Sequence, residues 1–206
     1  ITVVFFFFRN ACLSIFHHHS GIMTNSVLRM KQVRTECRRI YMTNNDILIR
    51  LRYAFDLKNT EVVDIFKLGG LNYTKDDVMN MLIKVRDDEE APENFIKVNN
   101  KMLETFLNGF ITFKRGPQKD EDGNVKPPME ATGKENANNL LLKKVKIALG
   151  LTSEQVVDYL YEGGVTVSKG EIGAILRNPT HKNYKVCGDR FARCFLKGLT
   201  MEYRNV

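Results

Sequence analysis

The chain repeats itself, because a segment that begins at Asn44 recurs from Asn138 onward at a constant offset. The alignment of the two segments runs without a gap to Leu82 in the first copy and Leu176 in the second. It resumes near the end of the chain, where Phe106-Leu107-Asn108-Gly109 faces Phe195-Leu196-Lys197-Gly198. A repeat of this length indicates that one supersecondary unit has been duplicated. The repeat therefore constrains the architecture strongly, although it names no reaction.

Each copy predicts four helices, because apolar residues recur at helical spacing and no segment alternates like a strand. The paired asparagines at 44–45 and 138–139 are suitable N-caps for the first helices. Glycine pairs at 69–70 and 163–164 should end the second helices in the left-handed conformation.

The third helices should begin with capping boxes, Thr74 to Asp77 and Ser168 to Glu171, and run to about residues 86 and 177. In the fourth helices, Gly109 and Gly198 interrupt an apolar face. A glycine in a helix interior costs roughly 1 kcal/mol relative to alanine. We therefore expect another helix to pass close to each of them.

The predicted fold is all-α: a tandem duplication of a four-helix unit. Residues 42–116 form the first repeat, residues 117–137 a linker rich in Pro, Gly and charged residues, and residues 138–206 the second repeat. Units of about 70 residues are small for independent cores. We expect the two copies to dock on each other at least in part.

Residues 1–41 are expected to be a non-native upstream extension, with the true start at Met42. They open on Ile1, carry a phenylalanine run and lack the features of a secretory signal. The segment from Arg38 to Met42 can be encoded as AGG AGA AUU UAU AUG, which has the form of a bacterial ribosome-binding sequence before a start codon. The apolar run is also far too short for a membrane span, which needs roughly 20 residues.

The second repeat is the basic one. The whole chain carries a net charge of +7, but residues 1–41 contribute six basic residues and one acidic residue, a net of +5. Residues 138–206 hold 11 basic and six acidic residues, also a net of +5, whereas residues 42–116 hold 11 and 12. Any attraction of this protein for anions should therefore be strongest on the second repeat.

Catalytic and metal-binding motifs find little support. After Met42 the only histidine is His181, and its distances along the chain to Cys187 and Asp189 match no nucleophile motif. Cys187 and Cys194 lie seven residues apart, whereas structural zinc sites usually pair ligands two to four residues apart. We predict no catalytic residue, no cofactor and no metal, and keep an enzyme centred on His181 as a remote alternative.

Cations, amides and one aromatic ring gather in and around the segment from Arg177 to Lys185. Such residues can contact phosphates and stack on a base, although a solvated basic face explains most such runs. The predicted polyanion-binding residues are Lys144, Lys146, Arg177, His181, Lys182, Tyr184, Lys185, Arg190 and Arg193.

The second and third helices of the basic copy also have the outline of a helix-turn-helix. The connection from Gly163 to Val167 is longer than usual, however, and the helix after it offers only two basic groups. A role in reading a DNA groove is therefore weakly supported.

Several segments resemble the bacterial YehS-like proteins, a domain-of-unknown-function family numbered 1456. The segments that carry the resemblance are Met42-Thr43-Asn44-Asn45-Asp46-Ile47-Leu48, Leu51-Arg52-Tyr53-Ala54-Phe55-Asp56-Leu57, Asn178-Pro179-Thr180-His181-Lys182-Asn183-Tyr184 and Phe195-Leu196-Lys197-Gly198-Leu199. The resemblance covers Met42 to about Arg204. It implies a soluble protein of the bacterial cytosol and supplies no catalytic or ligand-binding residue.

The leading hypothesis is a non-enzymatic cytoplasmic binding module that uses the basic second repeat on nucleic acid or another polyanion. The alternative is a protein-protein interaction adaptor or homodimer that presents an apolar groove to its partner, which could be an acidic protein. Salt distinguishes them, because phosphate contacts weaken steeply as salt rises and an apolar interface does not. We expect no membrane association, and the sequence leaves the oligomeric state open.

Overall fold

The computed structural model describes residues 41–85 and 89–204, and it confirms the all-α prediction. The described residues form eight helices and no strand. The helices of the first copy are α2 (Asn44–Ala54), α3 (Asn59–Gly69), α4 (Lys75–Met81) and α5 (Asn100–Arg115). Those of the second copy are α6 (Ala137–Leu149), α7 (Ser153–Glu162), α8 (Lys169–Ile175) and α9 (Asp189–Arg204). The predicted extension 1–41 lies outside the described residues except for Tyr41.

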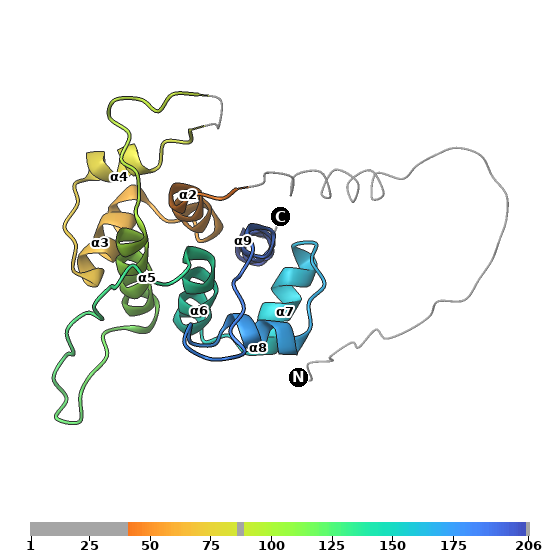
Figure 1. The fold of residues 1–206 in the computed structure, drawn as a ribbon. Coiled ribbons are helices and arrows are strands. Elements are labelled where there is room, and N and C mark those ends of the chain that lie inside the picture. The colour runs from red at the N-terminus through yellow and green to blue at the C-terminus, as the bar shows by residue number, and fades with distance from the viewer. Residues whose placement is uncertain (1–40, 86–88, 205–206) are drawn as a thin grey trace, which may run out of the picture.

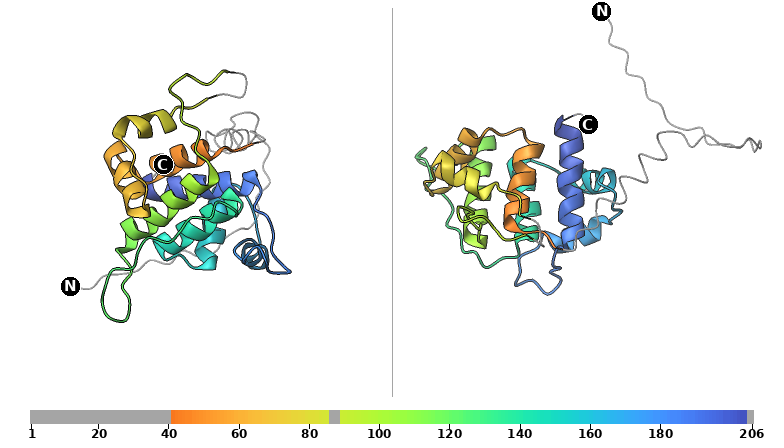
Figure 2. Two further views of the ribbon diagram at one scale, coloured as in Figure 1. Left: turned by 60° about the vertical axis from the view of Figure 1, so that its left-hand side comes forward. Right: turned by 90° about the horizontal axis from the view of Figure 1, so that it is seen from above.

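The two copies share one core. The first helix of each copy packs against the last helix of the other, so that α2 lies beside α9 and α6 beside α5. Helices α3 and α4 flank this central group on one side, and α7 and α8 flank it on the other (Figures 1 and 2). Buried side chains from both copies form a single apolar cluster. The copies therefore dock on each other, as their small size predicts.

Two equivalent arginines hold the copies together at the helix ends. Arg115, the last residue of α5, donates from Nη1 to the carbonyl oxygen of Ile147 at 3.2 Å. Arg204, the last residue of α9, donates from Nη1 to the carbonyl oxygen of Tyr53 at 2.8 Å. Tyr53 O and Ile147 O also accept from backbone amides of their own copies, Asp56 N at 3.3 Å and Gly150 N at 3.2 Å, so each guanidinium adds a second hydrogen bond that comes from the other copy. The four residues correspond pairwise in the repeat, so the packing has an approximate two-fold symmetry.

The helices cross closely at the glycines, as the repeat pattern predicts. A Cβ at Gly109 would lie 1.8 Å from the carbonyl oxygen of Ile65, and a Cβ at Gly198 would lie 1.9 Å from that of Tyr159. The partner helices also present glycine at these crossings: a Cβ at Gly69 would lie 2.2 Å from Thr105 O, and one at Gly163 2.0 Å from Cys194 O. Absence of a side chain at these positions allows α3 to meet α5 and α7 to meet α9.

The paired asparagines are not the N-caps that we expected. Thr43 and Asn136 cap α2 and α6, and the pairs occupy the first turns of these helices. Asn45 is buried and donates to the carbonyl oxygens of Met81 at 2.8 Å and Ile96 at 2.9 Å. Asn139 makes the equivalent bonds to Ile175 and Lys185. These side chains therefore join distant parts of one copy instead of capping their own helix.

The same bonds explain why the third helices are shorter than predicted. The capping boxes at Thr74 and Ser168 are present as expected. Helices α4 and α8 nevertheless end at Met81 and Ile175, five residues before 86 and two before 177. The carbonyl oxygens of these last residues accept hydrogen bonds from the asparagine side chains, so the chain is free to leave the helix there.

The segment between the repeats is partly fixed on the first copy. Met129 O accepts a hydrogen bond from Asn108 Nδ2 at 2.9 Å, and Gly133 N donates to Glu104 Oε2 at 2.8 Å. Ala131, between these two points, is buried. The end of the predicted linker thus covers part of the α5 surface and satisfies its polar groups.

Candidate polyanion-binding surface

Residues 177–185, which we call the basic loop, form two successive turns after α8. Asn178 Oδ1 accepts from the backbone and the hydroxyl of Thr180 at 3.1 and 3.0 Å. The amide of His181 donates to Asn178 O, and that of Tyr184 donates to His181 O, both at 2.9 Å. Asn and Ser/Thr side chains stabilise turns in this way. The basic loop therefore has a defined backbone conformation.

The base of the basic loop is fastened to the helical core. The amide of Lys185 donates to Ala174 O at 3.1 Å, and Lys185 O accepts from Asn139 Nδ2 at 2.9 Å. Asn139 Oδ1 also accepts from the amide of Cys187 at 2.8 Å. Because Asn139 is fully buried, its two bonds tie the base of the loop to the core and fix where the loop leaves it.

Five of the predicted binding residues are exposed to solvent, namely Arg177, His181, Lys182, Lys185 and Arg190. Lys185 is partly neutralised, since its Nζ lies 3.3 Å from Glu171 Oε1. The pKa of Glu171 is lowered by its hydrogen bond from the backbone of Ser168 and, in addition, by Lys185. Arg177 and Lys182 thus contribute most of the accessible positive charge of the basic loop.

Tyr184 is half-buried, which limits its predicted role as a stacking platform. The ammonium of Lys143 lies 5.9 Å from the centroid of its ring. Burial raises the pKa of the Tyr184 phenol, and the charge of Glu135 adds to this effect. Lys143 also forms an ion pair with Glu135. The ring therefore helps to place the basic loop against α6, in addition to any contact it makes with a ligand.

The prediction that Arg193 shares the exposed surface is wrong. Arg193 is only 4% exposed, because the inner face of α9 that carries it packs toward α2. Lys144 and Lys146 on α6 are half-buried. Desolvation lowers the pKa of Lys144, although the nearby carboxylates of Glu104 and Glu135 oppose this shift. The accessible cations therefore come from the basic loop and Arg190 more than from the inner helices.

The residues of the remote enzyme hypothesis lie in contrasting environments. His181 is exposed, and its Nδ1 accepts from the amide of Asn183 at 3.0 Å. Cys187 is buried, and desolvation together with the charge of Asp189 raises its pKa to about 12. The carboxylate of Asp189 accepts from the backbone of Met42 at 2.9 Å and from Asn138 Nδ2 at 2.7 Å. A thiol held neutral in this way is a poor nucleophile.

Cys187 should resist thiol-specific reagents in the native protein. At pH 8 its labelling, followed by mass spectrometry of the peptide, should be at least roughly 100-fold slower than in the unfolded chain, because only the thiolate reacts. Since the folded pKa lies near 12 and the ordinary value is 9.0, the neutral thiol contributes stability fully below about pH 9. This contribution is lost as the pH rises from 9 toward 12. Rapid labelling of Cys187 at pH 8 would contradict the burial.

The helix-turn-helix outline is not supported by the geometry of α7 and α8. Six residues separate the two helices, and α8 has only seven residues. Lys169, at the start of α8, lies 2.7 Å from Glu154 of α7 in an ion pair. A recognition helix usually presents several free side chains to base edges, and α8 is too short for this.

The repeat contained a signal that residue-by-residue inspection missed. In the alignment of the last helices, where Phe106 faces Phe195, Arg193 aligns with Glu104 and Lys197 aligns with Asn108. Positions that should be equivalent by symmetry therefore carry opposite or different charge.

Two further features bear on what the described part of the chain can do. None of its helices is long and apolar enough to cross a membrane. Within residues 41–85 and 89–204, histidine, cysteine and acidic side chains do not gather in groups of three or more that could hold a metal ion.

Fold and surface together define an all-helical protein made of two fused four-helix copies. The family model described as "Protein of unknown function (DUF1456)" matches residues 44–116 and 138–205, which are the two copies. The chain belongs to this family. It is 40% identical over 158 residues to the uncharacterized protein YehS of Escherichia coli strain K12, an alignment that covers 77% of this chain and 94% of YehS. No solved structure matches the chain.

Proposed function

We propose that the protein is a non-enzymatic binding module whose basic loop and Arg190 contact the phosphates of a nucleic acid. The observation that carries the proposal is the exposure of several cations on a loop whose backbone is already ordered. Ordering a flexible loop on binding costs free energy, so a loop fixed in advance retains more of the interaction energy for affinity. Phosphate contacts of this kind need no base-specific groove.

The contrast between the copies supports this assignment to the second copy. The segment after α4, which corresponds to the basic loop, carries exposed Glu90 and Glu93. In Figure 1 this acidic segment and the basic loop lie on opposite sides of the molecule. A polyanion would be attracted to one side and repelled from the other, because the potential of exposed charges acts over roughly 10 Å at 0.1 M salt. Binding should therefore be oriented.

Reversing Arg177 and Lys182 to glutamate should remove most of the binding. Lys185 is left intact, because a glutamate there would face Glu171 and confuse loss of contact with local repulsion. Fluorescence anisotropy with short single-stranded DNA, duplex DNA and RNA at low salt would measure affinity. For a duplex, two lost phosphate contacts should reduce the slope of log K against log salt by about 1.8.

The matched control is the reversal of Lys97 and Lys101 to glutamate. Both lysines are exposed on the first copy, and the pair changes the net charge by the same amount. Binding by this variant should stay within about threefold of the parent protein. Equal losses in the two variants would show that net charge alone matters. If none of the three nucleic acids binds at low salt, the proposal fails, and an adaptor for a protein partner becomes the hypothesis to pursue.

A further inference from the structure

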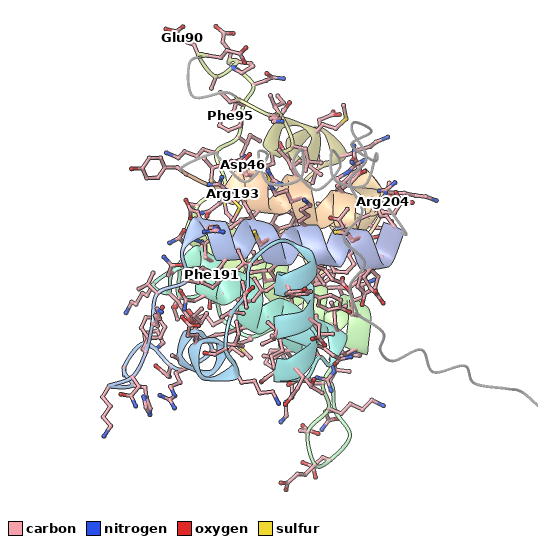
Figure 3. The ribbon with its side chains drawn as sticks, turned by 90° about the vertical axis from the view of Figure 1, so that its right-hand side faces the viewer. Asp46, Glu90, Phe95, Phe191, Arg193 and Arg204 are labelled. Carbon is pink, nitrogen blue, oxygen red and sulfur yellow. The ribbon has the colours of Figure 1, made fainter. Side chains whose placement is uncertain are left out.

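Two cationic side chains on the inner face of α9 have buried nitrogen atoms without sufficient counter-charge. Arg193 and Lys197 lie one helical turn apart and therefore on the same face of the helix. The Nη1 atom of Arg193 and the Nζ atom of Lys197 are inaccessible to solvent, and neither has a hydrogen-bond partner in the part of the chain that the structure describes. Figure 3 places Arg193 where α9 runs beside α2.

The nearby carboxylates are engaged with other groups. Asp189 Oδ2 lies 4.0 Å from Arg193 Nη2, but the same carboxylate accepts from Met42 N and Asn138 Nδ2. Asp46 Oδ2 accepts from the backbone and hydroxyl of its own cap, Thr43, at 3.1 and 2.8 Å. Asp189 thus offsets only part of the Arg193 charge, and the Lys197 ammonium has no carboxylate partner among residues 41–85 and 89–204.

The equivalent positions of the first copy show what such a site requires. Glu104 aligns with Arg193, and its carboxylate accepts from Gly133 N and Thr132 Oγ1. Asn108 aligns with Lys197, and its amide donates to Met129 O. Donors from the polypeptide thus meet the carboxylate of the first copy, together with the nearby positive charge of Lys144. In the second copy an arginine replaces the glutamate and a lysine replaces the neutral asparagine, so a group that completes this place must supply acceptors and negative charge.

The helix opposite these cations carries a further cation, Arg50, which is exposed to solvent. In the alignment that begins with Asn44 facing Asn138, Arg50 on α2 corresponds to Lys144 on α6. Because α2 packs on α9 as α6 packs on α5, Arg50 lies on the side of α2 that corresponds to the Lys144 side of α6. A buried charge without a partner is strongly unfavourable unless an opposite charge accompanies it.

We propose that this place between α9 and α2 binds a phosphate-type oxyanion, held by Arg193 Nη1 and Lys197 Nζ. A guanidinium provides directed donors for oxyanions, and a lysine ammonium is a common phosphate ligand. A small anion suits this place better than a polymer, because Arg193 is only 4% exposed. This site is separate from the exposed basic loop and does not depend on binding of nucleic acid.

Inorganic phosphate should stabilise the full chain more than potassium chloride at the same ionic strength. At roughly 100 times Kd, the melting temperature should rise by about 5 to 10 °C, as expected for a ligand that binds only the folded state. Lys197→Met should abolish this rise. The variant should also melt above the parent protein in phosphate-free buffer and below it in saturating phosphate, because it removes an uncompensated charge and a ligand at once. Lys197→Arg, which keeps the charge, should retain at least part of the rise.

The control Lys182→Met removes one exposed lysine of the basic loop and should keep the full phosphate response, which separates this site from the proposed function. The proposal is overturned if phosphate gives no more than the chloride shift, or if Lys197→Met keeps the parent's response. Titration calorimetry with phenyl phosphate distinguishes the source of the anion. If phenyl phosphate binds and inorganic phosphate competes with it, the site accepts the phosphate group of an organic ester. If inorganic phosphate binds and phenyl phosphate does not, the ligand is the free anion.

Discussion

Replacing Gly198 with alanine should lower the free energy of unfolding by about 4 kcal/mol or more, which is the range reserved for severe disruptions of a core. The added methyl group would lie 1.9 Å from the carbonyl oxygen of Tyr159, which belongs to the backbone of α7. A carbonyl group of a helix backbone cannot rotate away from the added methyl group as a flexible side chain can. Helices α7 and α9 would have to separate, and the packing around Phe195 and Leu199 would loosen. Urea unfolding followed by circular dichroism measures the change.

Gly173→Ala is the matched control, because it makes the same chemical change within α8. A Cβ at Gly173 meets no atom within 4 Å, and its backbone is helical. Alanine there should stabilise the protein by roughly 0.5–1 kcal/mol, since glycine loses more conformational freedom on folding. Gly109→Ala should resemble Gly198→Ala, since its Cβ would lie 1.8 Å from Ile65 O. Normal stability of Gly198→Ala would mean that α7 and α9 do not cross as described.

The duplication, the helix number and the close crossings could all be predicted from the sequence. Each rests on local patterns: apolar spacing, capping boxes, and a glycine inside an apolar face at corresponding places, Gly109 and Gly198. Local sequence patterns predict structure well at positions where the geometry requires one residue type. A glycine in a helix interior is unfavourable unless something passes close to it, so its presence carries information about a neighbour.

The reciprocal packing of the copies could not be predicted in the same way. Nothing in the apolar stripe of α9 distinguishes α2 from α6 as its partner, because both helices come from the same ancestral pattern. Arg204 and Arg115 form hydrogen bonds between the copies, but an arginine at a helix end is equally expected on a solvated surface. Their role becomes visible only when Tyr53 O and Ile147 O are seen beside them.

The candidate surface was predicted in part for a related reason. Arg177 and Lys182 are exposed as expected, because a polar loop lies outside a helical core. Arg193 sits on a helix whose other residues mark it as amphipathic, and charge alone suggested its outer face. Its alignment with the buried Glu104 points to the inner face instead. Comparing the two copies is thus more informative than the composition of either one.

Replacing Asn139 with alanine should cost about 3 to 5 kcal/mol, because three hydrogen bonds, two of them buried and one partly buried, are lost together. The carbonyl oxygens of Ile175 and Lys185 lose their donor, and the amide of Cys187 loses its acceptor. Each buried polar group left without a partner costs roughly 1–3 kcal/mol. Asn139→Asp should be no better, since it keeps the acceptor but turns a second oxygen toward two carbonyl oxygens. Chemical denaturation gives the free energy of unfolding of both variants.

Asn139 also has a local role that global stability would not report. Its two bonds to Lys185 and Cys187 hold the base of the basic loop, so amide hydrogen exchange of residues 177–185 should accelerate in Asn139→Ala even where the protein stays folded. The exposed Asn183 is the control: its replacement by alanine should change stability by no more than about 0.5 kcal/mol and leave exchange unaltered. If Asn139→Ala loses stability but the basic loop exchanges as before, the loop is ordered by its own turns. If the loop exchanges faster and nucleic-acid affinity falls with it, the order imposed by Asn139 is part of the binding surface.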